Sequence, residues 1–315
     1  MEGTPSAATP GVPSPLEPEQ NTITVIVPAY NEGDGIEWGL DAAYRGLREL
    51  GLSHARFIVS DSSDTPATAA TARSWASRAG AALAIERSLQ RRSLKQALNV
   101  ALDHPWAKAD WILVMVADVV PRHGSLAVLL DKLVSAPMAV VAVGSCLPDP
   151  AYRSWRRRAG AWQLRLVHNL ARAQASSAIR AEGAFWAARG AAIQTFRYPI
   201  GRGSLADDVE LSRWLVSADL EALNVPEAVV YKVPPATFAE FRSQTLRSEL
   251  AVGHSPRVGL AQAAVAVRLA LRDPIGACLY ASWRLAAKVF RARDEAEMHS
   301  AELWQTQGTT KRGRR

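Results

Sequence analysis

The sequence predicts an α/β domain in which helices cover both faces of a mostly parallel central sheet. Short runs of β-branched and apolar residues recur along the first half of the chain, as in strands that are buried on both faces. Segments with apolar residues at helical spacing lie between these runs. Strands and helices that alternate in this way are typical of parallel sheets, because each crossover helix returns the chain to the same end of the sheet.

The first strand and helix are the clearest of these elements. Residues 23–27 are apolar and largely β-branched, and we expect Pro28 to end the strand because proline has no N–H to donate. Asp34 and Glu37 stand three residues apart, as in a capping box, and a helical apolar pattern follows to Leu50. The turn between strand and helix is therefore predicted at the carboxyl edge of the sheet, where such folds bind ligands.

The remaining elements follow in the same alternation. Further strands are predicted at 56–60, 82–86, 111–117, 138–143 and 184–188. Helices are predicted to begin at 66 and near 207, and to cover 93–102, 126–133, 154–175, 260–271 and 274–291. Asp273 is the expected N-cap of the last helix, with Pro274 at its first position.

Composition and these elements predict four segments. Residues 1–21 are expected to be a disordered tail, residues 22–250 the α/β domain, residues 251–293 a C-terminal helical extension, and residues 294–315 a polar, partly disordered tail. The first segment has neither the basic start nor the apolar core of a signal peptide. The chain of 315 residues is 48% hydrophobic, which excludes a wholly disordered protein.

The cysteines and the apolar stretches bear on location. Cys146 and Cys278 lie far apart in apolar sequence, and we expect two buried free thiols in a reducing compartment. No stretch of about 18 residues is apolar and uncharged, so a spanning helix is not expected. The sequence therefore predicts a cytoplasmic protein, with peripheral contact at the inner face of the membrane left open.

The positive charge is concentrated in one segment. The formal net charge is +7, and residues 151–180 contain seven arginines and no acid. Trp155 and Trp162 lie seven residues apart in the same segment. Three interpretations are open: an amphipathic helix packed on the domain, which we favour, contact with a membrane surface or lipid acceptor, and nucleic-acid binding. No nucleic-acid motif accompanies the arginines, so no nucleic-acid partner is expected.

Acids follow several predicted strands. Glu32, Asp61 and Asp118 should converge at one sheet edge, where a cation or ligand donors would offset their mutual repulsion. The alternative is that each acid only caps a turn, and we favour this for Asp34 and Asp64. Asp118 differs because its neighbours from 117 to 121 are apolar.

Six short motifs occur in a recognisable order. They are Val25-Ile-Val-Pro-Ala-Tyr-Asn-Glu32, Ile58-Val-Ser-Asp61, Ala97-Leu-Asn99, Val116-Ala-Asp118, Asp207-Asp208 and Gln244-Thr-Leu-Arg247. Over residues 22–250 the chain thereby resembles family-2 glycosyltransferases. The resemblance implies a GT-A fold and an inverting enzyme that uses a nucleotide-diphosphate sugar and usually Mg²⁺ or Mn²⁺. The partners expected are that donor and a hydroxyl acceptor of unknown identity.

The resemblance also implies roles for individual residues. The nucleoside would contact Pro28, Ala29, Tyr30, Glu32 and Asp61. Asp118 matches the last acid of the DxD motif and would bind the metal, which neutralises the charge of the leaving diphosphate. Asp208 matches the general base that takes the proton of the acceptor hydroxyl. The sugar or acceptor side is assigned to Asp207, Gln244 and Arg247.

The chain departs from the family pattern at three positions. Val116 replaces the first DxD acid, Ser93 stands where a glycine is frequent, and Ser248 replaces the tryptophan of processive polymerases. We therefore predict transfer of a single sugar. The alternatives are a catalytically silent nucleotide-sugar-binding protein and a glycolipid synthase at the membrane surface. A nucleotidyltransferase is a third option, although it would normally carry a Gly-rich phosphate loop near the first strand.

Overall fold

A computed structural model describes residues 21–90, 92–173, 184–200, 207–242 and 260–298 of the chain. Eight strands of the described part form one sheet in the order β3-β2-β1-β4-β7-β6-β8-β5. Their bounds are β1 Ile23–Ala29, β2 Arg56–Asp61, β3 Ala82–Arg87, β4 Trp111–Met115, β5 Val119–Pro121, β6 Ala139–Pro148, β7 Phe185–Arg189 and β8 Glu221–Lys232. Strands β1 to β4 pair in parallel, and β7 is antiparallel to both of its neighbours.

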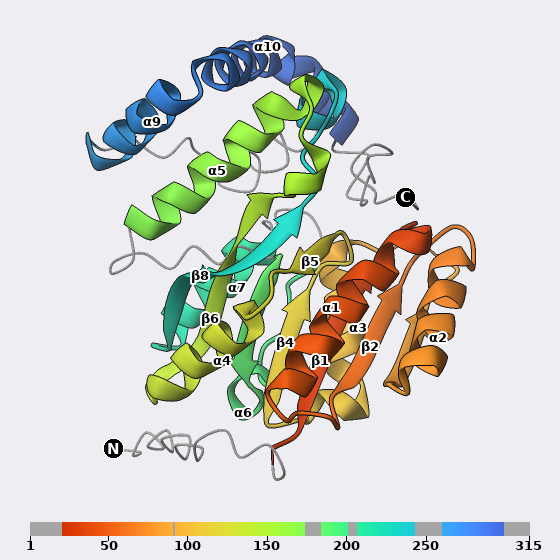
Figure 1. The fold of residues 1–315 in the computed structure, drawn as a ribbon. Coiled ribbons are helices and arrows are strands. Elements are labelled where there is room, and N and C mark those ends of the chain that lie inside the picture. The colour runs from red at the N-terminus through yellow and green to blue at the C-terminus, as the bar shows by residue number, and fades with distance from the viewer. Residues whose placement is uncertain (1–20, 91, 174–183, 201–206, 243–259, 299–315) are drawn as a thin grey trace, which may run out of the picture.

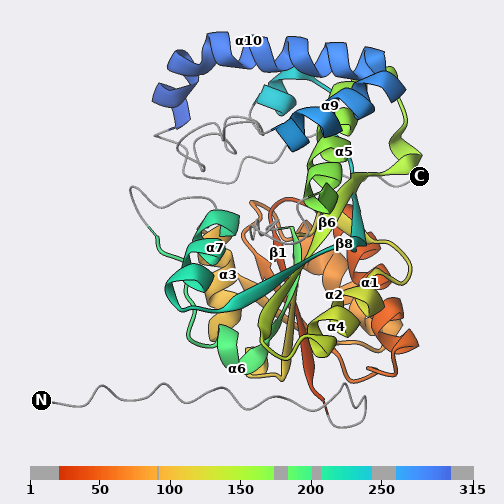
Figure 2. The ribbon, with the colours of Figure 1, turned by 90° about the vertical axis from the view of Figure 1, so that its left-hand side faces the viewer.

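Helices cover both faces of this sheet, as predicted (Figures 1 and 2). One face carries α1 Ile36–Glu49, α2 Ala67–Ala79 and α4 Ser125–Ser135. The other carries α3 Leu94–Asp103, α6 Gly190–Ile193 and α7 Asp207–Ser217. Helices α5 Arg158–Ala173, α9 Leu260–Arg272 and α10 Pro274–Met298 form a separate layer beyond the sheet edge (Figure 1).

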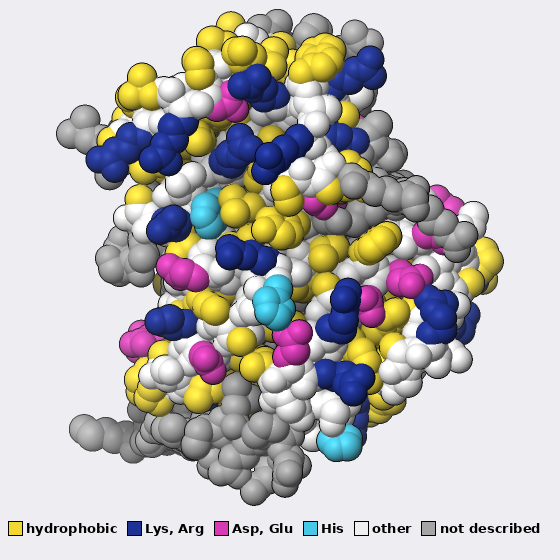
Figure 3. Space-filling model, in the orientation of Figure 1, with side chains coloured by type: hydrophobic (Ala, Val, Ile, Leu, Met, Phe, Trp, Pro, Cys, Tyr) yellow, Lys and Arg dark blue, Asp and Glu magenta, His cyan; other side chains and the backbone are white. Residues whose placement is uncertain are grey.

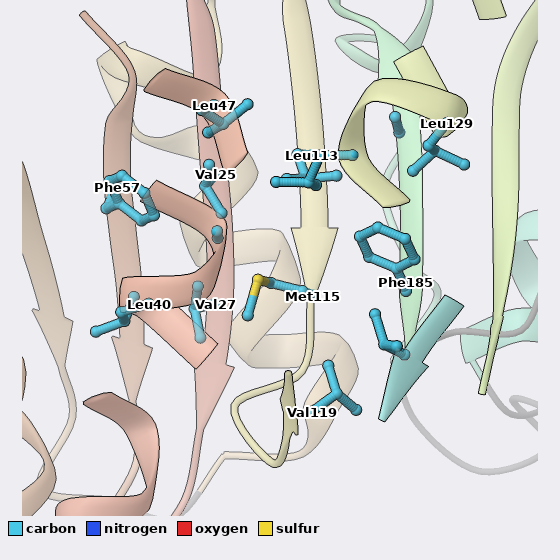
Figure 4. Close-up of a cluster of buried hydrophobic side chains, with 14 of the residues drawn as sticks. Val25, Val27, Leu40, Leu47, Phe57, Leu113, Met115, Val119, Leu129 and Phe185 are labelled. Atoms are coloured by element: carbon cyan, nitrogen blue, oxygen red, sulfur yellow. The ribbon is translucent and has the colours of Figure 1, made fainter. Parts of the chain in front are cut away.

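Alternating side chains of the strands build two cores. Val25 and Val27 of β1 pack with Leu40 of α1 on one face (Figure 4), whereas Ile26 packs with Leu98 of α3 on the other. All of these side chains are buried, and each is worth about 1.5–3 kcal/mol relative to exposure. The two-sided burial explains why the strand sequence is apolar throughout.

Two local expectations were wrong. Strand β1 continues through Pro28, because β4 pairs with β1 only as far as Ile26 and the missing N–H breaks no ladder bond on that side. Asp34 and Glu37 form no capping box. Instead, Glu37 pairs with Arg78 at 2.6 Å.

Other differences concern the second half of the chain. Both cysteines are free, but Cys278 is exposed on α10 whereas Cys146 is buried. Helix α10 continues to Met298, beyond the expected end of the extension at 293. The strands β5 and β8 were not predicted. β8 contains Pro226 at an irregular stretch of its pairing with β6, and a proline normally argues against a central strand.

The helical layer is held together by aromatic contacts and one ion-pair cluster. The rings of Trp162 on α5 and Tyr280 on α10 lie 4.5 Å apart, and Phe241 contacts Trp283 at 5.3 Å. Asp273 caps α10 by accepting from the Gly276 N–H at 3.0 Å, as predicted. Within the described ranges, no helix is long and apolar enough to cross a bilayer.

Candidate active site

The turns that follow β1 and β2 are joined by hydrogen bonds at the carboxyl edge of the sheet. Asn31 adopts a left-handed backbone with φ 54°, and its N–H donates to Ser63 Oγ at 2.7 Å. Tyr30 Oη and Asn31 Nδ2 both donate to Asp64 Oδ2, at 2.9 and 2.6 Å. Asp64 is therefore a turn residue, as expected, and the turn between Pro28 and Glu32 is fixed before any ligand arrives.

Asp61 lies next to Ala29 in the sheet register and is fully buried. Its Oδ1 accepts hydrogen bonds from the N–H and the hydroxyl of Ser63. Its Oδ2 has no hydrogen-bond partner among the described residues, and the nearest cation is Arg87 Nε at 3.9 Å. A buried carboxylate oxygen without a donor is unfavourable, so this atom is suited to accept an N–H from a ligand.

Asp118 lies between β4 and β5, beside the end of β1. The Ala117 N–H donates to Pro28 O at 3.3 Å, which ties this segment to the first turn. Gly39 of α1 allows the close approach, because a Cβ there would stand 2.7 Å from Val119 O. Asp61 and the segment that carries Asp118 both adjoin the end of β1, and Glu32 stands in the turn that follows this strand.

A basic partner of Asp118 was missed. Lys232 Nζ at the end of β8 lies 3.0 Å from Asp118 Oδ2, and both side chains are about one-fifth exposed. Although the sequence neighbours of Asp118 are apolar, β8 brings a distant lysine next to its carboxylate. The sequence signal that could have revealed Lys232 is the apolar run from Ala228 to Tyr231, which ends at this residue.

The acidic pair Asp207-Asp208 forms the first turn of α7. Asp208 Oδ1 accepts from the Val209 N–H at 2.8 Å. Burial, and next the charge of Asp208, raise the pKa of Asp207 to about 7, although backbone hydrogen bonds and Lys95 oppose the shift. Near neutral pH the Asp207 carboxyl therefore holds its proton much more readily than an ordinary aspartate does.

Tyr198 lies close to this pair. Burial, followed by the charges of Asp207 and Asp208, raises the pKa of its phenol well above the usual value, so the ring stays neutral. Asn99 of α3 makes two hydrogen bonds to the backbone of Tyr198: Nδ2 donates to the carbonyl at 2.9 Å, and Oδ1 accepts from the N–H at 2.8 Å. The Ala97-Leu98-Asn99 motif thereby fixes the segment that approaches α7.

The structure leaves part of the predicted site untested. Gln244 and Arg247 lie outside the described residues. Within the described ranges, no three His, Cys, Asp or Glu side chains gather as a protein-built metal site. Asp118 alone offers a carboxylate at the position that the resemblance assigns to metal.

The structure is thus an open α/β sheet with acids at its carboxyl edge, the edge at which such sheets bind ligands. A family described as "Glycosyltransferase like family 2" matches residues 18–250, and the chain belongs to this family. The protein is a glycosyltransferase with a GT-A fold, as the motifs predicted.

One of the similar solved structures supports this fold. The mannosyltransferase PcManGT from Pyrobaculum calidifontis, in complex with GDP-Man and Mn²⁺, is similar with a TM-score of 0.57 at 22% identity, covering 92% of this chain and 84% of that one. Glucosyl-3-phosphoglycerate synthase from Mycobacterium tuberculosis, in complex with Mn²⁺, UDP and phosphoglyceric acid, gives a TM-score of 0.47 at 18% identity, over 76% of this chain and 81% of that one. No curated protein matches the chain.

Proposed function

We propose that the protein transfers a single sugar from a nucleotide-diphosphate sugar to a hydroxyl acceptor by direct displacement with inversion. The observation that carries this proposal is the buried Asp61, whose Oδ2 accepts no hydrogen bond from the described residues, at the same sheet edge as Asp118. One acid is suited to accept from a nucleobase, and the other can face the diphosphate side of the donor. The donor-bound state of PcManGT supports this use of the fold.

The nucleoside would lie against the turn from Pro28 to Glu32. This turn is rigid because Asn31 and Tyr30 are bonded to the second turn at Ser63 and Asp64. A site held in shape before binding loses little conformational entropy when the ligand arrives. We therefore assign contact with the nucleoside to Pro28, Ala29, Tyr30 and Glu32, and a hydrogen bond with the base to Asp61.

Asp118 fits a divalent cation that the donor helps to hold. Mg²⁺ is commonly bound by one or two carboxylates together with substrate phosphates, so one protein carboxylate is sufficient. A bound Mg²⁺ or Mn²⁺ would supply positive charge to the departing diphosphate. Lys232 Nζ lies 3.0 Å from Asp118 Oδ2. A cation bound at this carboxylate would compete with Lys232, whose ammonium group would then contact a phosphate oxygen of the donor.

The proton of the acceptor hydroxyl would pass to Asp208. Burial and the charge of Asp208 raise the pKa of Asp207, so we assign the role of base to Asp208 rather than to Asp207. The bond from the acceptor oxygen to the anomeric carbon forms as the bond to the diphosphate breaks, and the proton goes to the Asp208 carboxylate. Asp207, Gln244 and Arg247 are assigned to the sugar or acceptor.

The test is nucleotide release from UDP-, GDP- and TDP-sugars with Mn²⁺, offered with simple hydroxyl acceptors. Release from one donor class by the wild type, with its loss in Asp208→Asn, is the expected result. A protein that binds a nucleotide but releases none from any donor would instead be the catalytically silent alternative. Long polymeric products would contradict the prediction of single-sugar transfer drawn from Ser248.

A further inference from the structure

The helical layer of α5, α9 and α10 has an outer surface that the proposed chemistry does not use. Arginines gather across this layer in Figure 3, and hydrophobic side chains lie beside them over α10. We call it the outer surface and define it by Arg153, Trp155, Arg156, Val267, Arg268, Leu271, Arg272, Ile275 and Leu285.

The arginines of this layer exceed the acids that could neutralise them. Arg158 and Arg165 share a single carboxylate, Asp273, at 2.7 and 3.6 Å. No carboxylate of the described residues pairs with the arginines at four further positions, namely Arg153, Arg156, Arg268 and Arg272. A cavity of about 660 Å³ opens between α5 and the ends of β6 and β8, with five arginines and two aspartates in its lining. The layer thus carries an uncompensated positive field.

Large apolar side chains stand among these arginines. Leu271 is 79% exposed, Trp155 73% and Leu285 66%, and Val267 and Ile275 are exposed as well. The inner side of α10 is already packed against the protein, because Tyr280 and Trp283 contact Trp162 and Phe241. The exposed apolar side chains are therefore on the side of the layer away from these packing contacts. A surface that combines them with cations is suited to a partner that is both apolar and anionic.

We propose that the outer surface docks the protein peripherally on an anionic lipid bilayer. Cationic side chains are attracted to anionic headgroups, while Trp, Leu and Ile side chains insert at the boundary with the acyl chains. No described helix can span the bilayer, so the contact is interfacial. No residue that defines the outer surface is assigned to the proposed reaction, and the inference does not depend on that reaction.

Two other occupants fit the surface less well. A second copy of the chain would present the same arginines, and like charges at a self-complementary interface oppose association. A nucleic acid would match the charge but would leave Val267, Leu271, Ile275 and Leu285 without apolar partners, since bases stack on aromatic faces.

The test is co-flotation of the full chain with vesicles of phosphatidylcholine alone or mixed equally with phosphatidylglycerol. We expect binding to the mixed vesicles, weakened by salt, and at least about tenfold weaker binding for Arg268→Glu/Arg272→Glu. Leu271→Ser/Ile275→Ser should also lose affinity, by a few-fold or more. The matched controls are Arg73→Glu/Lys132→Glu and Met138→Ser, which make similar changes at exposed positions outside the layer.

Thermal melting and the nucleotide-induced shift of each variant show that it is folded. Equal flotation with both vesicle types, or wild-type binding by Arg268→Glu/Arg272→Glu, would overturn the proposal. Dimerisation or oligonucleotide retention without vesicle binding would overturn it as well. Because nucleotide binding is measured in parallel, loss of docking is distinguishable from failure of the proposed sugar transfer.

Discussion

Asp61 and Asp207 in the candidate site differ from Asp273 in the helical layer in how many hydrogen-bond donors and cations surround the carboxylate. Asp273 accepts from Arg158 and from the Gly276 N–H, and Arg165 lies close by. Asp61 keeps an oxygen without a donor, and Asp207 has a pKa raised by burial beside another acid. A saturated carboxylate joins parts of the fold, whereas one left without donors or beside a like charge is suited to a ligand or a proton.

The largest effect is expected for Asp208→Asn. Loss of the base should lower turnover about 10³-fold, since general bases contribute roughly 10²–10⁴-fold. Nucleotide binding should remain, because Asp208 is not assigned to the nucleoside. The matched control is Asp207→Asn, one residue away, which should retain far more activity. Equal losses in the two variants, measured by nucleotide release, would show that the pair has been assigned the wrong way round.

A smaller loss is expected for Asp118→Asn, of about 10²-fold at saturating Mn²⁺, because charge on the leaving diphosphate is then poorly neutralised. Lys232→Met tests the same ion pair from the other side. Removing the ammonium group frees the carboxylate, and half-maximal activity should be reached at a lower Mn²⁺ concentration. A higher requirement for Mn²⁺ in Lys232→Met would contradict the proposed exchange of Lys232 for the cation.

Asp273→Asn is expected to lower the stability of the helical layer by about 2 kcal/mol, the value of hydrogen bonds to charged groups. Burial opposes ionisation, but the hydrogen bonds from Arg158 and Gly276 outweigh it and lower the pKa of Asp273. The stabilisation is therefore present at neutral pH and is lost as pH falls through the depressed pKa. Melting temperatures of wild type and variant should converge in acid, and a constant difference would argue against this origin.

Asp207→Asn should show the opposite dependence on pH. With a folded pKa near 7, Asp207 binds its proton more tightly in the folded chain, so wild-type stability falls as pH rises from about 4 to 7. The variant cannot ionise, and its free energy of unfolding should exceed that of wild type by roughly 1–2 kcal/mol at pH 8. This value is reduced because the side chain is partly exposed to solvent. A gain that is equal at pH 5 and pH 8 would contradict the raised pKa.

The sequence predicted what depends on local pattern. The strands that hold Pro28 and Asp61, and the strand that precedes Asp118, were found because apolar runs and terminal acids are visible within a few residues. Contacts between distant segments were not predictable in this way. Lys232 pairs with Asp118, more than a hundred residues earlier in the chain, and lies on a strand that contains Pro226. Asn99 is hydrogen-bonded to the backbone of Tyr198, which lies 99 residues later. The pKa of Asp207 likewise depends on burial that only the assembled fold provides.

The central claim is that the sheet edge binds a nucleoside diphosphate through the buried carboxylate of Asp61. Its most direct test is a calorimetric titration of UDP, GDP and TDP with Mn²⁺ into wild type and Asp61→Asn, with Asp34→Asn as an exposed control. The account predicts binding of at least one nucleotide by wild type and control, and affinity about tenfold or more lower in Asp61→Asn. Absence of binding by every nucleotide, or equal affinity in Asp61→Asn, would contradict it.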